Sequence, residues 1–123
     1  KINLSVGSVL EKQNFKSSSF DIVSMMGVLS IFDDHKKVLD NLIHWTKKGG
    51  KKIILSIFNP YPYDVKVKYQ HSKDIKNKTL QSGWNMYSVQ TISKYLKQNK
   101  KVKKFKFSNF QLKCNVKFEL FTY

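Results

Sequence analysis

Few side chains in this sequence of 123 residues could carry acid–base, nucleophilic or metal chemistry. The three histidines and the single cysteine, Cys114, show no spacing typical of a metal site, so we expect no bound metal. One cysteine cannot form an internal disulfide, and Cys114 is interpreted as a buried, unreactive thiol. His35 is a candidate general base; the alternative is a water-exposed position in the first turn of a helix. The other two histidines are His44 and His71.

Lysine dominates the charge of the chain. The formal net charge is +15, and all 23 basic residues are lysines. So basic a chain points to nucleic acid or to an anionic membrane surface. However, arginine, the residue that forks onto phosphates and guanine edges, is absent, as is alanine, which indicates a compositional bias. We therefore expect a solvated lysine surface rather than a dedicated nucleic-acid face.

The length fits a single domain spanning residues 1–123, and no linker-like stretch divides it. No apolar run is long enough to cross a bilayer, and the opening Lys1-Ile2-Asn3 does not resemble a signal peptide. We expect a cytoplasmic protein without a membrane partner.

The centre of the chain, residues 20–60, predicts a strand, a helix and a second strand. Residues 20–26 and 53–58 are continuous apolar runs, typical of strands that helices cover on both faces. Two such strands joined by a helix form a βαβ unit, with parallel strands and a right-handed crossover.

The helix between these strands carries signals at both ends. Asp33 and Asp34 supply an N-cap and favourable negative charge. Lys47 and Lys48 suit a last turn, and Gly49-Gly50 can take the left-handed conformation that ends a helix. The apolar face of the helix consists of Val38, Leu39, Leu42, Ile43 and Trp45.

The flanking segments predict less regular structure. Residues 1–6 alternate apolar and polar and predict a strand, whereas residues 61–82 lack periodicity and predict a lid or loop. Ser88 caps a predicted helix that ends near Asn99. Two further strands, at residues 102–107 and 116–122, are too close in sequence for a crossover and predict an antiparallel pair.

Several short motifs follow one another in a fixed order: Phe20-Asp21-Ile22-Val23, Gly27-Val28-Leu29, Asp33-Asp34, Gly49-Gly50, Ile53-Ile54-Leu55 and Gly83-Trp84-Asn85-Met86-Tyr87-Ser88. Together they resemble the second half of a class I S-adenosylmethionine-dependent methyltransferase. The family's sheet order, 3-2-1-4-5-7-6, implies a partial Rossmann-like α/β sheet here. In it, strands 4-5-7-6 are contiguous, the last pair is antiparallel, and helices cover both faces.

Two features of that family have no match in the chain. One is the glycine-rich loop after the first strand, where the backbone approaches the cofactor. The other is the acidic residue that holds the ribose hydroxyls. The resemblance thus implies an incomplete domain whose fourth strand, residues 20–26, lies at an exposed edge. Three segments could cover that edge: the strand at residues 1–6, a second copy of the chain in a homodimer, or a preceding N-terminal segment.

The resemblance also implies where S-adenosylmethionine binds. Gly7, Ser8 and Val9, after the third strand, would lie at the adenine; the alternative is that Gly7-Ser8 is only a turn that ends a strand. The carboxyl end of the fourth strand would border the cofactor sulfur, since ligands of open α/β sheets bind beyond the carboxyl ends of strands. Its residues are Met25, Met26 and Gly27, although Met26 is equally well interpreted as a core residue.

A cluster of polar and aromatic residues is assigned to the acceptor pocket or its lid, with loop packing as the alternative. The stretch from Asn59 to Tyr63 is not the Asn-Pro-Pro-Tyr motif of amino-group DNA methyltransferases, because it follows the fifth strand and lacks adjacent prolines. The assigned residues are Asn59, Tyr61, Tyr63, Trp84 and Tyr87.

The resulting hypothesis is methyl transfer from S-adenosylmethionine to a small-molecule acceptor, with the chain inactive alone. One alternative is a nucleic-acid-binding module built on residues 100–106, with Phe105, Phe107 and Phe110 stacking on bases. The alternation of apolar residues and lysines along this predicted strand indicates, however, that the phenylalanines face inward. A second alternative is a catalytically dead remnant that serves for dimerisation.

Overall fold

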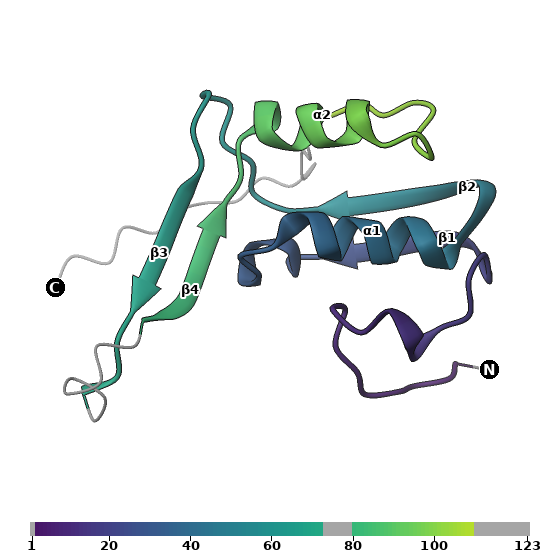
Figure 1. Cartoon of the computed structure of the whole chain (residues 1–123), viewed down its shortest axis with the longest axis horizontal. Helices are drawn as coiled ribbons and strands as arrows, with labels where there is room; N and C mark the ends of the chain where they lie inside the picture. The colour runs from purple at the N-terminus through teal and green to yellow at the C-terminus, as the bar shows by residue number, and fades with distance from the viewer. Residues whose placement is uncertain (1, 73–79, 110–123) are drawn as a thin grey trace, which may run out of the picture.

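A parallel strand pair joined by a helix forms the centre of the fold (Figure 1). The computed structural model describes residues 2–72 and 80–109. β1 (Phe20–Met26) pairs with β2 (Thr46–Leu55) in parallel, and α1 (His35–Trp45) connects them. The predicted first strand, the connecting helix and the parallel pairing are therefore confirmed.

An antiparallel hairpin and a second helix follow this unit. β3 (Val65–Tyr69) pairs with β4 (Gln81–Met86), and α2 (Val89–Gln98) comes directly after β4. Two short 3-10 helices, η1 (Lys12–Asn14) and η2 (Leu29–Ile31), lie on either side of β1 in the sequence. No helix in the described ranges has the length and apolar character needed to cross a membrane.

α1 starts as predicted but ends earlier. The Asp34 carboxylate accepts a hydrogen bond from the Lys37 backbone N–H at 3.0 Å, which caps the helix. At the other end, the Thr46 hydroxyl donates to the Leu42 carbonyl at 2.6 Å, and the Thr46 backbone is already extended. The prediction that Lys47 and Lys48 lie in the last turn is wrong, because Thr46 satisfies the terminal carbonyl first.

The double glycine lies within β2 rather than at the end of the helix. The register of β1 and β2 shifts between the pairs Phe20–Thr46 and Ile22–Lys51, and Gly49 adopts a left-handed φ of +84° in that interval. A Cβ on Gly50 would lie 2.7 Å from the Asp21 carbonyl oxygen, so only glycine allows this approach. β2 also ends at Leu55, short of the predicted residue 58.

The apolar face of α1 forms the core with residues from β1, η2 and α2. Four of the five predicted face residues are buried, and Ile43 is half-buried. The Trp45 indole N–H donates to the Lys12 carbonyl at 2.8 Å, so the ring is both packed and satisfied. The buried apolar residues are Met25, Leu29, Val38, Leu39, Leu42, Trp45, Tyr87 and Ile92.

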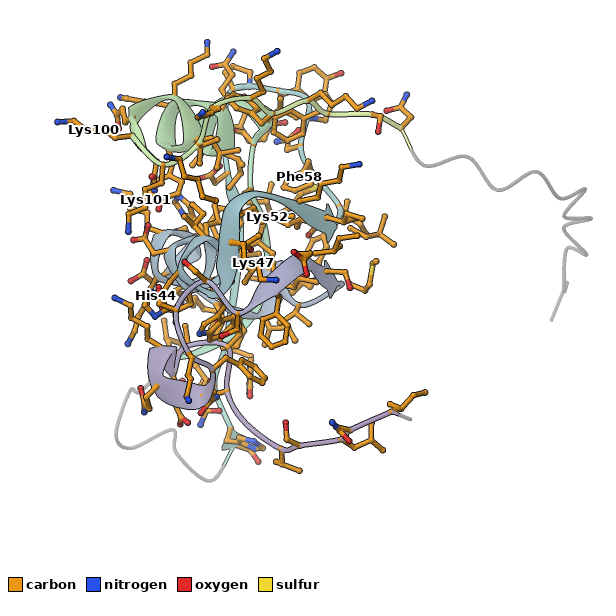
Figure 2. All side chains as sticks on the ribbon, turned by 90° about the vertical axis from the view of Figure 1, so that its right-hand side faces the viewer. His44, Lys47, Lys52, Phe58, Lys100 and Lys101 are labelled. Atoms are coloured by element: carbon orange, nitrogen blue, oxygen red, sulfur yellow. The ribbon has the colours of Figure 1, made fainter. Side chains whose placement is uncertain are left out.

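The second face of the β1–β2 sheet carries no helix among the described residues, so the prediction of helices on both faces is not met. α1 lies on one side of these strands in Figure 2. α2 packs against α1, where the Tyr95 hydroxyl donates to the Asp40 carboxylate. By the alternation of side chains along a strand, four exposed apolar residues point to one face of the sheet: Ile22, Met26, Ile53 and Leu55.

Three further predictions fail, each because long-range pairing decides the outcome. Residues 2–6 form no strand, and Ile2, Leu4 and Val6 are almost fully exposed, since no neighbouring strand pairs with them. Residues 61–82, predicted to be irregular, contain β3 and the start of β4. Residues 102–107 form no strand.

The implied strand order 4-5-7-6 is not observed in the described ranges, which hold two separate two-stranded sheets. Residues 116–122, predicted to form the last strand, lie outside those ranges. The cap of α2 is as predicted: the Ser88 hydroxyl oxygen accepts from the Thr91 N–H at 2.9 Å, and Asn99 follows the last turn.

Replacement of a core leucine tests the packing of α1. Leu39 is 2% exposed, so Leu39→Ala should lower the free energy of unfolding by about 2–5 kcal/mol through lost burial and a residual cavity. Leu80→Ala is the matched control, because Leu80 is 62% exposed and should change stability by less than about 0.5 kcal/mol. Urea denaturation followed by circular dichroism measures both, and equal effects of the two variants would contradict the assignment of the core.

Candidate functional site

A groove of about 690 Å³ runs along β1. One wall is the strand itself, from Phe20 to Met26, and the other is the turn at residues 7–9. Its volume falls within the range of small-molecule sites, roughly 300–1,000 Å³. Five of the six predicted cofactor residues line this groove: Gly7, Ser8, Val9, Met25 and Met26.

The turn at residues 7–9 is held in place by side chains of η1 and α1. The Asn14 side-chain amide donates to the Ser8 carbonyl at 2.9 Å, and the buried Asn41 amide donates to the Val9 carbonyl at 2.8 Å. A Cβ on Gly7 would lie 2.7 Å from Asn14 Nδ2, so a glycine leaves room for that bond. The Ser8 hydroxyl oxygen accepts from the Leu10 N–H at 3.2 Å.

The carboxyl end of β1 separates the roles of its two methionines. Met25 is buried and packs in the core, whereas the Met26 side chain is 54% exposed. Gly27 follows with a left-handed φ of +69°, and its N–H donates to the Leu55 carbonyl at 2.8 Å. Gly27 therefore turns the chain at the end of the groove without lining it. Met26 is the methionine available to a ligand.

The β3–β4 hairpin stands beyond the carboxyl ends of β1 and β2 (Figure 1). The link between β2 and the hairpin is a turn built on Asn59, which is buried. The Asn59 side-chain amide donates to the Tyr63 carbonyl at 2.8 Å, and its side-chain oxygen accepts from the Tyr61 N–H at 3.1 Å. The side chain of Asn59 thus shapes the turn.

The four predicted aromatic acceptor residues fall into different environments. Tyr61 and Tyr63 are 63% and 57% exposed, and their rings stack 6.1 Å apart at 8°. Trp84 is partly exposed on β4, opposite Val67. Tyr87 is buried, its hydroxyl donates to the Phe32 carbonyl, and burial raises its pKa to about 12. The structure brings Tyr61 and Tyr63 together at the surface and places Tyr87 in the core.

His35 is half-buried, so the water-exposed interpretation is wrong. Its ring lies 4.7 Å from Tyr87 and 6.0 Å from Tyr95, between centroids. Burial lowers the pKa of His35, and the nearby Asp64 carboxylate opposes this only in part. The imidazole is therefore neutral at pH 7, and its Nε2 is buried without a hydrogen-bond partner among the described residues. It does not line the groove.

Asp33 has a role that the sequence did not reveal. Its carboxylate accepts hydrogen bonds from Lys68, from the Ser82 hydroxyl at 2.9 Å and from the Asn85 amide at 3.0 Å. These bonds lower the pKa of Asp33 to about 2, with the Lys68 bond contributing most. The partners lie 35 to 52 residues further along the chain, on β3 and β4, so no local signal predicts the contact. Asp33 joins the hairpin to the start of α1.

Comparison with known families gives one match. Residues 2–54 match the family model described as a methyltransferase domain. This segment is therefore similar to part of a class I S-adenosylmethionine-dependent methyltransferase domain. The match includes both walls of the groove, α1 and most of β2, and the resemblance is confirmed for that part. A comparison with proteins of curated function finds no match.

This family normally binds S-adenosylmethionine, and methyl transfer is its general chemistry. The segment that matches the family model ends before the Asn59 turn, so the hairpin and α2 lie outside it. Within the described ranges, no group of three or more His, Cys, Asp or Glu side chains is arranged to hold a metal ion. Cys114 lies outside those ranges.

Protonation of Asp33 should release the hairpin. Because the pKa of this carboxyl falls from 3.8 to about 2 on folding, its stabilising effect is complete above pH 3.8 and is lost as the pH falls through about 2. Asp33→Asn should therefore lower the melting temperature at pH 7, and the gap to wild type should close towards pH 2, as followed by circular dichroism.

Asp21→Asn is the control, since it also removes one carboxylate and one lysine partner. The Asp21 carboxylate lies 3.0 Å from Lys47 Nζ and is largely exposed, so this variant should stay close to wild type. A gap between Asp33→Asn and wild type that persists at pH 2 would contradict the assignment.

Proposed function

We propose that this chain forms the cofactor groove of a methyltransferase that transfers a methyl group from S-adenosylmethionine to a small-molecule acceptor. The observation that carries the proposal is the groove along β1. Residues far apart in the sequence, Gly7 to Val9 and Met25 to Met26, meet there in a segment that matches the family. The groove also reaches the carboxyl end of β1, where ligands of open α/β sheets bind.

The groove residues fit one side of the cofactor. S-adenosylmethionine supplies an electrophilic methyl group on a sulfonium. Met26 offers a polarisable, apolar contact to that end, and the Ser8 hydroxyl offers a hydrogen bond to the edge of the base. Gly27, beside the groove, keeps the chain turned away from it. No carboxylate is among the lining residues, so the ribose hydroxyls need a partner from elsewhere.

The acceptor is assigned to the exposed pair Tyr61 and Tyr63, with Trp84 nearer the hairpin tip. Two stacked rings present a flat apolar surface against which a small acceptor can orient. Asn59 and Tyr87 are assigned supporting roles without contact to the acceptor. The side chain of Asn59 shapes the turn, and Tyr87 packs in the core. His35 is a weak candidate base: its imidazole is neutral, but its Nε2 is buried and the residue does not line the groove.

The sheet needs additional strands to complete this site. Among residues 2–72 and 80–109, nothing pairs with the outer edge of β1 or covers the apolar face of the sheet, and both call for a covering segment. Residues 2–6 do not supply it. A second copy would bring together two chains of charge +15, which repel one another. We therefore assign the cover to a preceding segment of the same domain, which also supplies the glycine-rich loop.

Titration with S-adenosylhomocysteine tests the cofactor groove. The chain alone should bind in the millimolar range or weaker, because it has no match to the family's glycine-rich loop or to its acidic ribose-binding residue. In nuclear magnetic resonance spectra, the chemical-shift changes caused by the ligand should be largest at Gly7, Ser8 and Met26. Met26→Trp should abolish them by filling the groove. Ile31→Trp should not, since Ile31 is similarly exposed outside the groove. Micromolar or tighter binding would show that the missing half is dispensable.

The mass of the chain in solution tests how the sheet is completed. Sedimentation equilibrium should give the monomer mass of 14.5 kDa at physiological salt, because charge repulsion opposes pairing through β1. A stable dimer that Ile22→Lys disrupts would instead assign the cover to a second copy.

A further inference from the structure

The segment after α2 presents lysines and aromatic rings together on the surface. This strap, residues 99–107, contains five lysines and no acidic residue. Phe105 and Phe107 within it are 37% and 38% exposed. The expectation that these phenylalanines face inward rested on a strand that does not form. Of the two reasons against a nucleic-acid surface, inward-facing rings and absent arginine, only the absence of arginine remains.

Both ends of the strap are anchored to the fold. The Asn99 side-chain amide donates to the Asp40 carboxylate of α1 at 3.2 Å, and the Asn99 carbonyl accepts from the Val102 N–H at 2.9 Å. At the other end, the ring of Phe107 meets Phe58 edge to face at 5.4 Å. Phe105 contacts Phe107 at 6.1 Å, edge to face. The strap is therefore held in place before any ligand arrives.

The positive charge of the strap is not neutralised within the described ranges. The two ion pairs there are Lys47–Asp21 and Lys68–Asp33, and neither involves the strap. Lys100, Lys101 and His44 lie along one side of the molecule (Figure 2). The charges of Lys12 and Lys101 both act on His44, where they add to the effect of burial and lower its pKa. The positive field thus extends from the strap to the end of α1.

We propose that the strap binds single-stranded nucleic acid, with its lysines along the phosphate backbone and Phe105 stacked on a base. Cations that track a backbone beside an exposed aromatic ring are the usual means of binding single strands without sequence preference. The lack of arginine argues against sequence-specific recognition of guanine but not against this mode of binding, because a lysine serves a phosphate as a point charge. The site is independent of the groove along β1, and its test does not depend on methyl transfer.

Fluorescence anisotropy of the full chain with a labelled single-stranded oligothymidylate measures the binding. If the five strap lysines contact phosphates, the logarithm of affinity should fall with the logarithm of salt at a slope of about −3.5. The triple variant K103E/K104E/K106E should weaken binding and flatten the slope by about 2, because three contacts are lost. Phe105→Ala should weaken binding about 5- to 150-fold with the slope unchanged.

The matched control is K36E/K37E/K66E, which changes the net charge by the same amount at exposed lysines of α1 and β3. This variant should keep most of the affinity. Equal loss in both triple variants would show attraction to net charge alone and would overturn the proposal. So would equal binding of a duplex or of poly-glutamate, or no binding at low salt. Circular dichroism spectra that match wild type would exclude unfolding as the cause of any loss.

Discussion

The burial of α1 is the interaction on which every other part of the structure depends. Its apolar face packs on the β1–β2 pair, and the remaining segments attach to the same helix. The turn at residues 7–9 is fixed through Asn41, the hairpin through Asp33 just before the helix, and α2 through Asp40. A single amphipathic helix therefore sets the positions of the groove, the hairpin and the strap. Loss of its packing would displace all three together.

Local signals in the sequence predicted the start of each helix and the position of β1. A cap needs only one side chain and one backbone N–H three residues away, as at Asp34 and Ser88. The end of α1 was harder to predict, since a hydroxyl at Thr46 satisfied the last carbonyl before the glycines were reached. The short alternation of Val65 to Tyr69, which forms β3, was missed within a segment that otherwise lacks periodicity, and its partner strand lies beyond a long connection. Strand pairing between segments that are far apart in the sequence gives only a weak local signal, so it is hard to predict.

For the candidate site too, some residues could be predicted from the sequence and others could not. The resemblance placed Gly7 to Val9 and Met26 at one ligand, and the structure brings these residues into one groove. The exposure of Tyr61 and Tyr63 agrees with a surface role. The assignment of Tyr87 to the acceptor pocket could not be checked from the sequence, because the sequence does not reveal whether an aromatic ring is buried. In the structure, Tyr87 is buried in the core. Asp33 was missed because its three partners are far along the chain.

The bare face of the β1–β2 sheet has a consequence for how the isolated chain behaves in concentrated solution. Four exposed apolar side chains lie on that face beside a strand edge that no other described strand pairs with, a combination that favours contact between molecules. Repulsion between the lysine surfaces keeps such faces apart at low ionic strength. That repulsion is screened over about 8 Å at physiological salt and over about 3 Å at 1 M. The colloidal stability of the chain should therefore depend on its charge, and we expect added salt to lower its solubility.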